Sequence, residues 1–360
     1  MTAAEGRRSR SRRIAAALAV ARATFAIAVA ALVASACGGA SPVLERHLVF
    51  VRVTPPEVSV WIADADGRHA HRLSRGSSAA LAPDGRTVAV GRRDGIHLVS
   101  SDGKRDRRLT STRMVPQAWS PDGRWLVAAT DRALIAVDTR SGRWHRLAQG
   151  AIVGVDLAPS GRRVAYARAV RASPEDLCGA PTDLYVVRLS GADRRRLTRD
   201  GRSASPVWGP KRIAFRRLPR RKTLPVNCPP SGIWTIRPDG SELRPLIARP
   251  PDAMSRNGYY GLEPVAWLPG DGLLVGVRSE RGDEAARLDR SGRLLGFRLT
   301  TGKGRHRVVR PFYVDEASRD GRFAVGSGGG ERALLAIIRV SDGRPLFTLG
   351  GAVCCPDWNR

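Results

Sequence analysis

Short apolar runs separated by tight turns repeat along the chain between residues 47 and 358. The fullest copy is Trp119–Gly123 followed by Trp125–Val127, in which Ser-Pro-Asp-Gly separates two apolar runs. Proline presets φ and Asp-Gly supplies the positive φ values of a tight hairpin, so this pattern predicts strand, turn and strand. Further copies are Leu81–Gly85, Leu157–Gly161, Val207–Pro210, Ala266–Pro269 and Ala317–Gly321.

A second motif alternates with the first: an apolar strand, a polar turn with Gly, and a strand that ends in Leu. Its seven copies run from Trp61 to Leu73, His97 to Leu109, Ile135 to Leu147, Leu184 to Leu197, Ile233 to Leu246, Ala286 to Leu299 and Ala336 to Leu349. The copy that begins at Ala286 is degenerate. Together the two motifs predict units of four short strands, with a period of roughly 35 to 60 residues that is typical of propeller blades.

Two features of the repeat resemble TolB-like propellers, a WD-like family: the Trp119–Gly123 run and the Arg-Leu-Thr endings at Arg108–Thr110 and Arg196–Thr198. The resemblance spans residues 47–358 and implies an all-β propeller, but it is weak for function.

The two ends of the repeat region predict how the ring closes. The chain enters in mid-unit at Leu48–Val51, and Cys355–Trp358 matches an isolated first strand. Because a closed ring needs every edge paired, we expect the C-terminal strand to complete the first blade. That arrangement gives seven four-stranded blades. The TolB family usually has six, and a six-bladed ring with one irregular unit is the alternative.

The N-terminal residues predict a targeting segment. An Arg-rich stretch precedes an almost wholly apolar run from Ile14 to Ala36, and small residues lead directly to Cys37. This arrangement resembles the bacterial lipobox, in which the Cys is acylated, with Ala34 in the usual place of Leu. We therefore expect a signal peptide over 1–36, a tether over 37–46, a propeller over 47–360, and a lipid anchor at the outer face of the cell membrane. A secreted protein cut near Ala36 and an uncleaved anchor helix are the alternatives.

The charge of the chain is strongly positive and comes almost entirely from arginine. Residues 1–36 hold six Arg and one Glu, so +23 of the formal +28 lies on the rest, and only four of the 61 basic residues are Lys. A GC-rich genome produces such a bias without selection, although a basic surface attracts anions whatever its origin. Outside the cytoplasm the anions are lipid headgroups and wall polymers, so we expect no nucleic-acid partner.

Long connections mark a candidate binding face. Residues 169–182 and 216–231 are second-to-third loops of the fourth and fifth blades, and 248–263 joins the fifth blade to the sixth, all on one rim. Loops on a rigid scaffold commonly carry binding. Cations beside aromatics pair with anionic or sugar-like ligands, whereas the other interpretation is a solvated charge run. The candidate residues are Arg216, Arg217, Arg220, Arg221, Lys222, Tyr259 and Tyr260.

The cysteines suit an oxidising compartment. Cys178 and Cys228 occupy matching places in two neighbouring blades, so we predict a disulfide between them. Metal ligation is the weaker alternative, because no His or carboxylate cluster accompanies them. The pair Cys354 and Cys355 leaves three readings open: a vicinal disulfide, two buried thiols, or a bridge to a partner.

No catalytic motif stands out. A Gly-x-Ser-x-Gly elbow and a His-Glu-x-x-His pattern are both absent from the sequence, and the Asp-Gly acids are turn formers. We therefore expect a monomeric, membrane-tethered binding scaffold without cofactor or metal, which engages a protein or an anionic cell-envelope component through the long-loop face. The alternative is a channel-centred extracytoplasmic enzyme of hydrolase or lyase type. Carboxylates or His on the ring axis would favour the enzyme, and a channel of small or apolar groups would favour the scaffold.

Overall fold

The structure is a computed structural model, and its chain separates into the units Met1–Leu44 and Glu45–Arg360. All described residues lie in the second unit. They are residues 47–54, 56–170, 181–219, 230–248, 259–279, 284–296, 312–318, 321–328, 334–341, 345–350 and 353–358. Among them no helix is long and apolar enough to cross a membrane.

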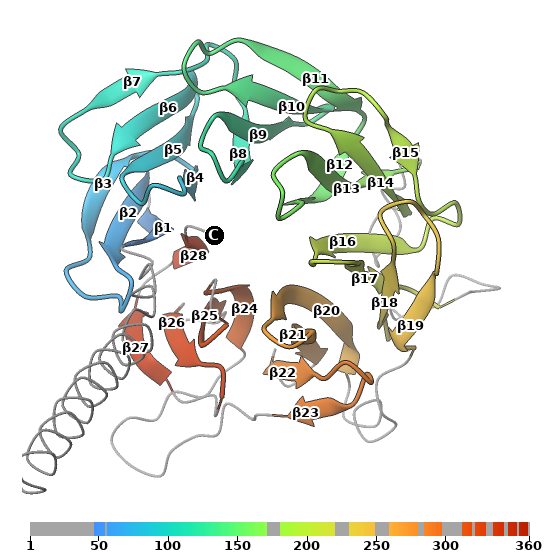
Figure 1. The fold of residues 1–360 in the computed structure, drawn as a ribbon. Coiled ribbons are helices and arrows are strands. Elements are labelled where there is room, and N and C mark those ends of the chain that lie inside the picture. The colour runs from blue at the N-terminus through green and yellow to red at the C-terminus, as the bar shows by residue number, and fades with distance from the viewer. Residues whose placement is uncertain are drawn as a thin grey trace, which may run out of the picture. The chain divides into compact units, whose positions relative to one another are not determined.

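Seven four-stranded antiparallel sheets surround a common axis in this unit, which confirms the seven-bladed propeller (Figure 1). Blade A comprises β28 (Val353–Trp358), β1 (His47–Thr54), β2 (Glu57–Asp64) and β3 (His71–Arg75). Blade B comprises β4 (Ser78–Leu81), β5 (Thr87–Arg92), β6 (Gly95–Ser100) and β7 (Asp106–Arg108). Blade C comprises β8 (Val115–Trp119), β9 (Trp125–Thr130), β10 (Ala133–Asp138) and β11 (Trp144–Gln149).

The other four blades repeat this order from the axis outward. Blade D comprises β12 (Ile152–Leu157), β13 (Arg163–Ala169), β14 (Thr182–Arg188) and β15 (Arg195–Arg196). Blade E comprises β16 (Ser203–Trp208), β17 (Ile213–Arg217), β18 (Gly232–Ile236) and β19 (Arg244–Ile247). Blade F comprises β20 (Tyr259–Leu268), β21 (Gly272–Ser279), β22 (Glu284–Leu288) and β23 (Leu294–Gly296). Blade G comprises β24 (Phe312–Ala317), β25 (Phe323–Gly328), β26 (Leu334–Arg339) and β27 (Pro345–Gly350).

The ring closes as the ends of the repeat predict. Strand β28 pairs antiparallel with β1, with Leu48 opposite Trp358 and Arg52 opposite Val353. The degenerate copy that begins near Ala286 still forms the third strand pair of its blade, β22 with β23, so the ring has seven four-stranded blades and the six-bladed alternative is wrong. Pairing at both edges of β1 leaves Leu48 and Phe50 almost fully buried.

Many of the hairpin turns contain a glycine with positive φ, and several also contain an aspartate that accepts hydrogen bonds within the turn. Gly123 has φ of 67° and Gly161 has the same value, a region that suits residues without a Cβ. In the Ser120–Trp125 turn, Ser120 Oγ donates to Asp122 Oδ1 at 2.6 Å and the backbone N–H of Arg124 donates to it at 3.1 Å. The Ser120 hydroxyl and the Arg124 N–H keep the pKa of Asp122 below its ordinary value. These aspartates therefore build turns, as the sequence predicts.

Apolar faces of neighbouring blades pack against each other to form the core. Between blades C and D, Val127, Leu134 and Ala136 meet Val164 and Tyr166, all buried. The alternation of apolar residues along each strand gives every blade two buried faces, because side chains of successive residues point to opposite sides.

A hydrogen bond from the outer strand also joins neighbouring blades. In blades B, C and D, the donor is a side chain of the fourth strand, at the same register position in each blade. It donates to a backbone carbonyl in the turn between the third and fourth strands of the next blade. The pairs are Arg107 to Thr139 at 2.7 Å, His145 to Leu189 at 2.6 Å and Arg195 to Asp239 at 2.9 Å. The tie thus repeats from blade to blade, while its donor changes from Arg to His in blade C.

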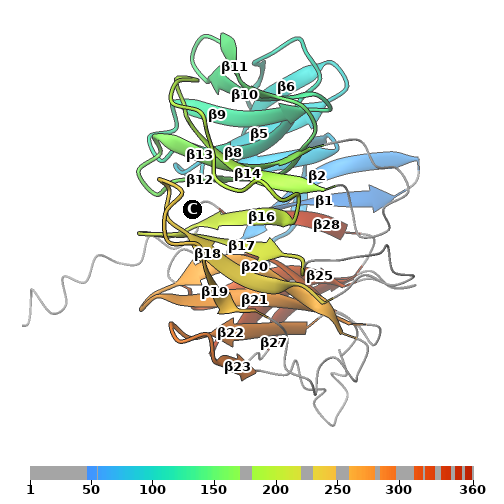
Figure 2. The same cartoon turned by 90° about the vertical axis from the view of Figure 1, so that its right-hand side faces the viewer.

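The strands run along the ring axis when the propeller is seen from the side (Figure 2). In antiparallel four-stranded blades, the first-to-second and third-to-fourth turns leave one end, and the second-to-third and inter-blade connections leave the other. We call these ends the short-turn face and the long-connection face.

Candidate functional site

The innermost strands of the seven blades surround the ring axis (Figure 1). A pocket of about 220 Å³ lies among four of them, β12, β16, β20 and β24. Small and apolar residues dominate its lining, which also includes two carboxylates. The lining residues are Gly154, Val155, Asp156, Ser205, Pro206, Val207, Pro264, Val265, Val314 and Asp315.

Carboxylates on the inner strands join one blade to the next. Asp156 Oδ2 in blade D accepts the backbone N–H of Trp208 in blade E at 2.6 Å. Asp357 Oδ2 in blade A accepts the N–H of Leu81 in blade B, also at 2.6 Å. In these positions the carboxylates satisfy backbone donors that would otherwise be buried without a partner, which stabilises the ring.

Other inner-strand side chains make inter-blade bonds of the same kind. Ser205 Oγ donates to Glu263 Oε1 at 2.6 Å, which links blades E and F. The indole N–H of Trp119 donates to the Ala80 carbonyl at 3.0 Å. The sequence pattern predicts the Trp residues at strand ends, but it does not predict that Asp156, Asp357 and Glu263 join neighbouring blades. Their signal is a carboxylate in an otherwise apolar first strand, as in Asp156-Leu157 and Asp357-Trp358.

Three strands that precede long stretches of sequence end at the long-connection face: β13 of blade D, and β17 and β19 of blade E. In blade D, two guanidinium groups lie near the ring of Tyr185: Arg168 Cζ lies 4.5 Å and Arg196 Cζ 5.9 Å from its centroid. Arg168 also donates to the Tyr185 hydroxyl at 2.8 Å.

Two of the predicted cations lie in a strand rather than in the loop after it. Arg216 and Arg217 belong to β17, and Arg217 is only 7% exposed. Its guanidinium donates to Ser203 Oγ at 3.1 Å, pairs with Asp200 and lies 5.1 Å from the centre of the Trp234 ring. Arg217 therefore anchors the start of the long connection and is not part of its open surface.

The remaining predicted residues divide into two groups. Tyr259 and Tyr260 begin β20 instead of ending the linker, and their side chains lie outside the described part of the structure. Six others lie wholly outside the described residues: Cys37, Cys178, Cys228, Arg220, Arg221 and Lys222.

The C-terminal cysteine pair lies in β28, the strand that closes the ring. The Cys355 side chain is exposed, so the reading of two buried thiols is wrong. Cys355 has φ of 56°, which accompanies the irregular pairing between Val49 and Val51 of the neighbouring strand. Within the described residues, no group of three or more His, Cys, Asp or Glu side chains could hold a metal ion.

Comparison with known sequences gives a partial match. The chain is 29% identical over 216 residues to Tricorn protease homolog 1 of Streptomyces coelicolor, a match that covers 52% of this chain and 19% of that protein. The chain thus spans about a fifth of the length of this curated relative. No protein-family model matches the chain.

Solved structures show where this fold recurs. An oligogalacturonate lyase in complex with manganese superposes with a TM-score of 0.57 at 14% identity, over 83% of each chain. TolB from Acinetobacter baumannii gives 0.50 at 15% identity, over 87% of this chain and 83% of that one. The propeller domain of the Trilobed protease from Pyrococcus furiosus gives 0.52 at 12% identity, over 84% and 88%. The chain is therefore a seven-bladed β-propeller whose resemblance to TolB is confirmed in its fold, a fold also found in a lyase and a protease.

Proposed function

We propose that this protein is an exported binding scaffold, held by lipid on Cys37 at the outer face of the cell membrane. Its long-connection face engages a protein or an anionic component of the cell envelope. The observation that carries the proposal is that three strands of blades D and E, each followed by a long stretch of sequence, end at the same side of the ring: β13, β17 and β19. Such segments vary without disturbing the scaffold, and for that reason they commonly carry recognition.

The chemistry of this face suits an anionic partner. Arg220, Arg221 and Lys222 lie in the connection that follows β17, and blade D adds the Arg168, Tyr185 and Arg196 group. Guanidinium groups pair with carboxylates and phosphates through two parallel hydrogen bonds, and flat aromatic rings hold them in position. The buried Arg217 holds the end of β17, three residues before the first of these cations in the sequence.

The inner strands support binding over catalysis. Asp156 and Glu263 accept hydrogen bonds from blade E, and Asp357 accepts one from blade B. A carboxylate committed to a neighbouring blade stabilises the ring. One observation favours the alternative, a channel-centred enzyme of hydrolase or lyase type: Asp156 and Asp315 line the same axial pocket.

Replacement of three cations tests the proposed face. In the Cys37→Ala chain, changing Arg220, Arg221 and Lys222 to Ser should weaken sedimentation with the organism's washed envelope fraction by about tenfold or more. The reason is that three charge-assisted contacts are lost. Co-sedimentation at several protein concentrations, at fixed ionic strength, measures the effect.

A matched control separates the face from general charge. Arg86, Lys104 and Arg293 are three exposed cations on the short-turn face, and their triple Ser variant removes the same charge. We expect this variant, and Asp315→Asn in the axial pocket, to bind like the parent. Equal loss in both triple variants would show nonspecific charge attraction and contradict the proposal. Loss in Asp315→Asn alone would favour the channel.

A further inference from the structure

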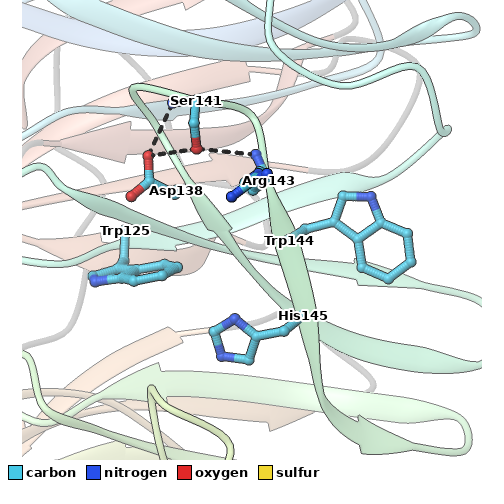
Figure 3. Close-up of a pocket in the computed structure, with 6 residues that line it drawn as sticks. All are labelled: Trp125, Asp138, Ser141, Arg143, Trp144 and His145. Atoms are coloured by element: carbon cyan, nitrogen blue, oxygen red, sulfur yellow. Dashed lines mark hydrogen bonds between the residues drawn. The ribbon is translucent and has the colours of Figure 1, made fainter.

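A second pocket lies on the short-turn face, and all the residues that line it belong to blade C. Its volume is about 400 Å³, within the range of roughly 300–1,000 Å³ typical of small-molecule sites. The residues that line it come from the start of β9 and from the β10–β11 hairpin (Figure 3). They are Trp125, Asp138, Ser141, Arg143, Trp144 and His145.

The side chains of Trp125, Asp138 and His145 share one face of the blade. Trp125 pairs with Asp138 across β9 and β10, and His145 pairs with Ala136 on the same face. The indole of Trp144 points to the other side of β11 (Figure 3). Trp125 and His145 meet edge to face, with ring centroids 5.4 Å apart.

The repeat explains why a pocket exists here. His145 occupies the position of the inter-blade tie that Arg107 holds in blade B and Arg195 in blade D. The imidazole makes the same bond to the next blade as the guanidinium does, but with a shorter side chain. At the start of the second strand, blade C carries Trp125 where blades B and D carry Thr87 and Arg163. Blade C thus differs from its two neighbours, blades B and D, at two adjoining positions, and both of these residues line the pocket.

The polar groups of the pocket have fixed roles. The Leu189 carbonyl can only accept, so His145 Nε2 is the donor in this bond, which leaves Nδ1 as the ring nitrogen that can bond a ligand. Asp138 Oδ1 accepts the Ser141 N–H at 2.9 Å and the Ser141 hydroxyl at 3.0 Å. These bonds, with that from the Arg140 N–H, hold the pKa of Asp138 below its ordinary value, so it is a carboxylate at neutral pH.

Cations surround the aromatic surface. Arg124 Cζ lies 5.6 Å from the centre of the Trp125 ring, and Arg140 and Arg143 are exposed on the adjoining turn. An indole packs well against the C–H face of a sugar ring, while carboxylate, hydroxyl and imidazole groups at its edge bond sugar hydroxyls. The arginines add affinity for a negative substituent on that sugar.

We propose that this pocket binds one sugar unit of an anionic glycan, with the sugar ring against Trp125 and its negative group toward Arg124 and Arg143. Asp138 accepts hydrogen bonds from sugar hydroxyls, and His145 Nδ1 accepts another. The site lies on the face opposite the long connections and is independent of the binding proposed there.

Isothermal titration calorimetry of the mature chain with two tetrasaccharides tests the site. One probe alternates glucuronate with N-acetylglucosamine, and the other contains N-acetylglucosamine alone. We expect the anionic probe to bind about tenfold or more tightly than the neutral probe. His145→Arg introduces the residue that blades B and D carry at this position and keeps the inter-blade bond, so it should fill the pocket without loss of folding and weaken binding about tenfold or more.

Two further variants complete the test. Trp125→Ala should abolish binding of the anionic probe. Phe323→Ala is its matched control, because Phe323 begins the second strand of blade G and also lies 5.6 Å beneath an arginine, Arg322. This control should retain binding. Equal affinity for both probes, or full binding by His145→Arg, would overturn the proposal. The Arg220, Arg221 and Lys222 variant should bind the probe normally, which separates this site from the long-connection face.

Discussion

Replacement of Asp183 by Ala should lower the free energy of unfolding by about 3–5 kcal/mol, the range typical when one partner of a buried ion pair is removed. Asp183 is fully buried at the start of β14. Its Oδ2 accepts Arg196 at 2.5 Å, and its Oδ1 accepts the Thr198 hydroxyl at 3.1 Å. The same Oδ1 accepts the backbone N–H groups of Asp200 and Gly201, each at 3.0 Å.

This carboxylate therefore secures the chain as it passes from blade D to blade E. Without it, the Thr198 hydroxyl and the N–H groups of Asp200 and Gly201 lose their acceptor. Arg196 also loses its counter-charge, because the hydrogen bond to Asp183 is what raises the pKa of Arg196. Urea unfolding followed by far-ultraviolet circular dichroism measures the change.

Glu57→Ala is a suitable control for this prediction. Glu57 also pairs with two arginines, Arg72 and Arg75, but its side chain is 40% exposed. Exposed pairs contribute about 0–1 kcal/mol, so the control should unfold near the parent. A loss for Asp183→Ala no larger than that of Glu57→Ala would contradict the role assigned to the buried carboxylate.

Alkaline pH should destabilise the propeller through Tyr166. Its side chain is fully buried in β13 and stacks on Tyr185 with ring centroids 5.3 Å apart. Burial raises the pKa of Tyr166 to about 12, whereas an unfolded tyrosine titrates near pH 10. The stabilising contribution is present below pH ~10 and is lost as the pH rises through about 12, a total of about 3 kcal/mol.

A Tyr166→Phe variant isolates this contribution from all other titrating groups. The Tyr166 hydroxyl has no hydrogen-bond partner among the described residues, so the variant should be at least as stable as the parent at pH 7. Between pH 9 and pH 11 the free energy of unfolding of the parent should fall by about 1 kcal/mol more than that of the variant, as measured by urea unfolding at the two pH values. If the free energy of unfolding fell equally with pH in parent and variant, burial of Tyr166 would not oppose its ionisation, and the prediction would be wrong.

Local sequence patterns predict most of this fold because each blade is built from contacts close in sequence. The Ser-Pro-Asp-Gly turns carry their own φ values and hydrogen bonds, as Gly123 and Asp122 show. The Arg-Leu-Thr endings also have a local cause: the hydroxyl of Thr110 accepts the N–H of Ile96 at 3.0 Å, and Thr198 accepts that of Leu184 at 2.9 Å. Ring closure follows from the unpaired edges at the two ends.

Side-chain contacts between residues that are distant in the sequence are less visible in it. Arg217 reads as part of a cationic loop, because its partners Asp200 and Ser203 precede it by 17 and 14 residues in another segment. The role of Asp156 depends on Trp208, which is 52 residues away. His145 becomes informative only when the register aligns it with Arg107 and Arg195. Such positions need the three-dimensional alignment of blades.

The intact mass of the membrane-fraction protein tests most directly whether this propeller is tethered at the outer face of the membrane. We expect a chain that begins at Cys37 with a diacylglyceryl increment, lost in Cys37→Ala, and a shift of about two daltons on reduction for each disulfide, including that between Cys178 and Cys228. A soluble, unmodified product cut near Ala36 would contradict the tether and would favour a secreted enzyme.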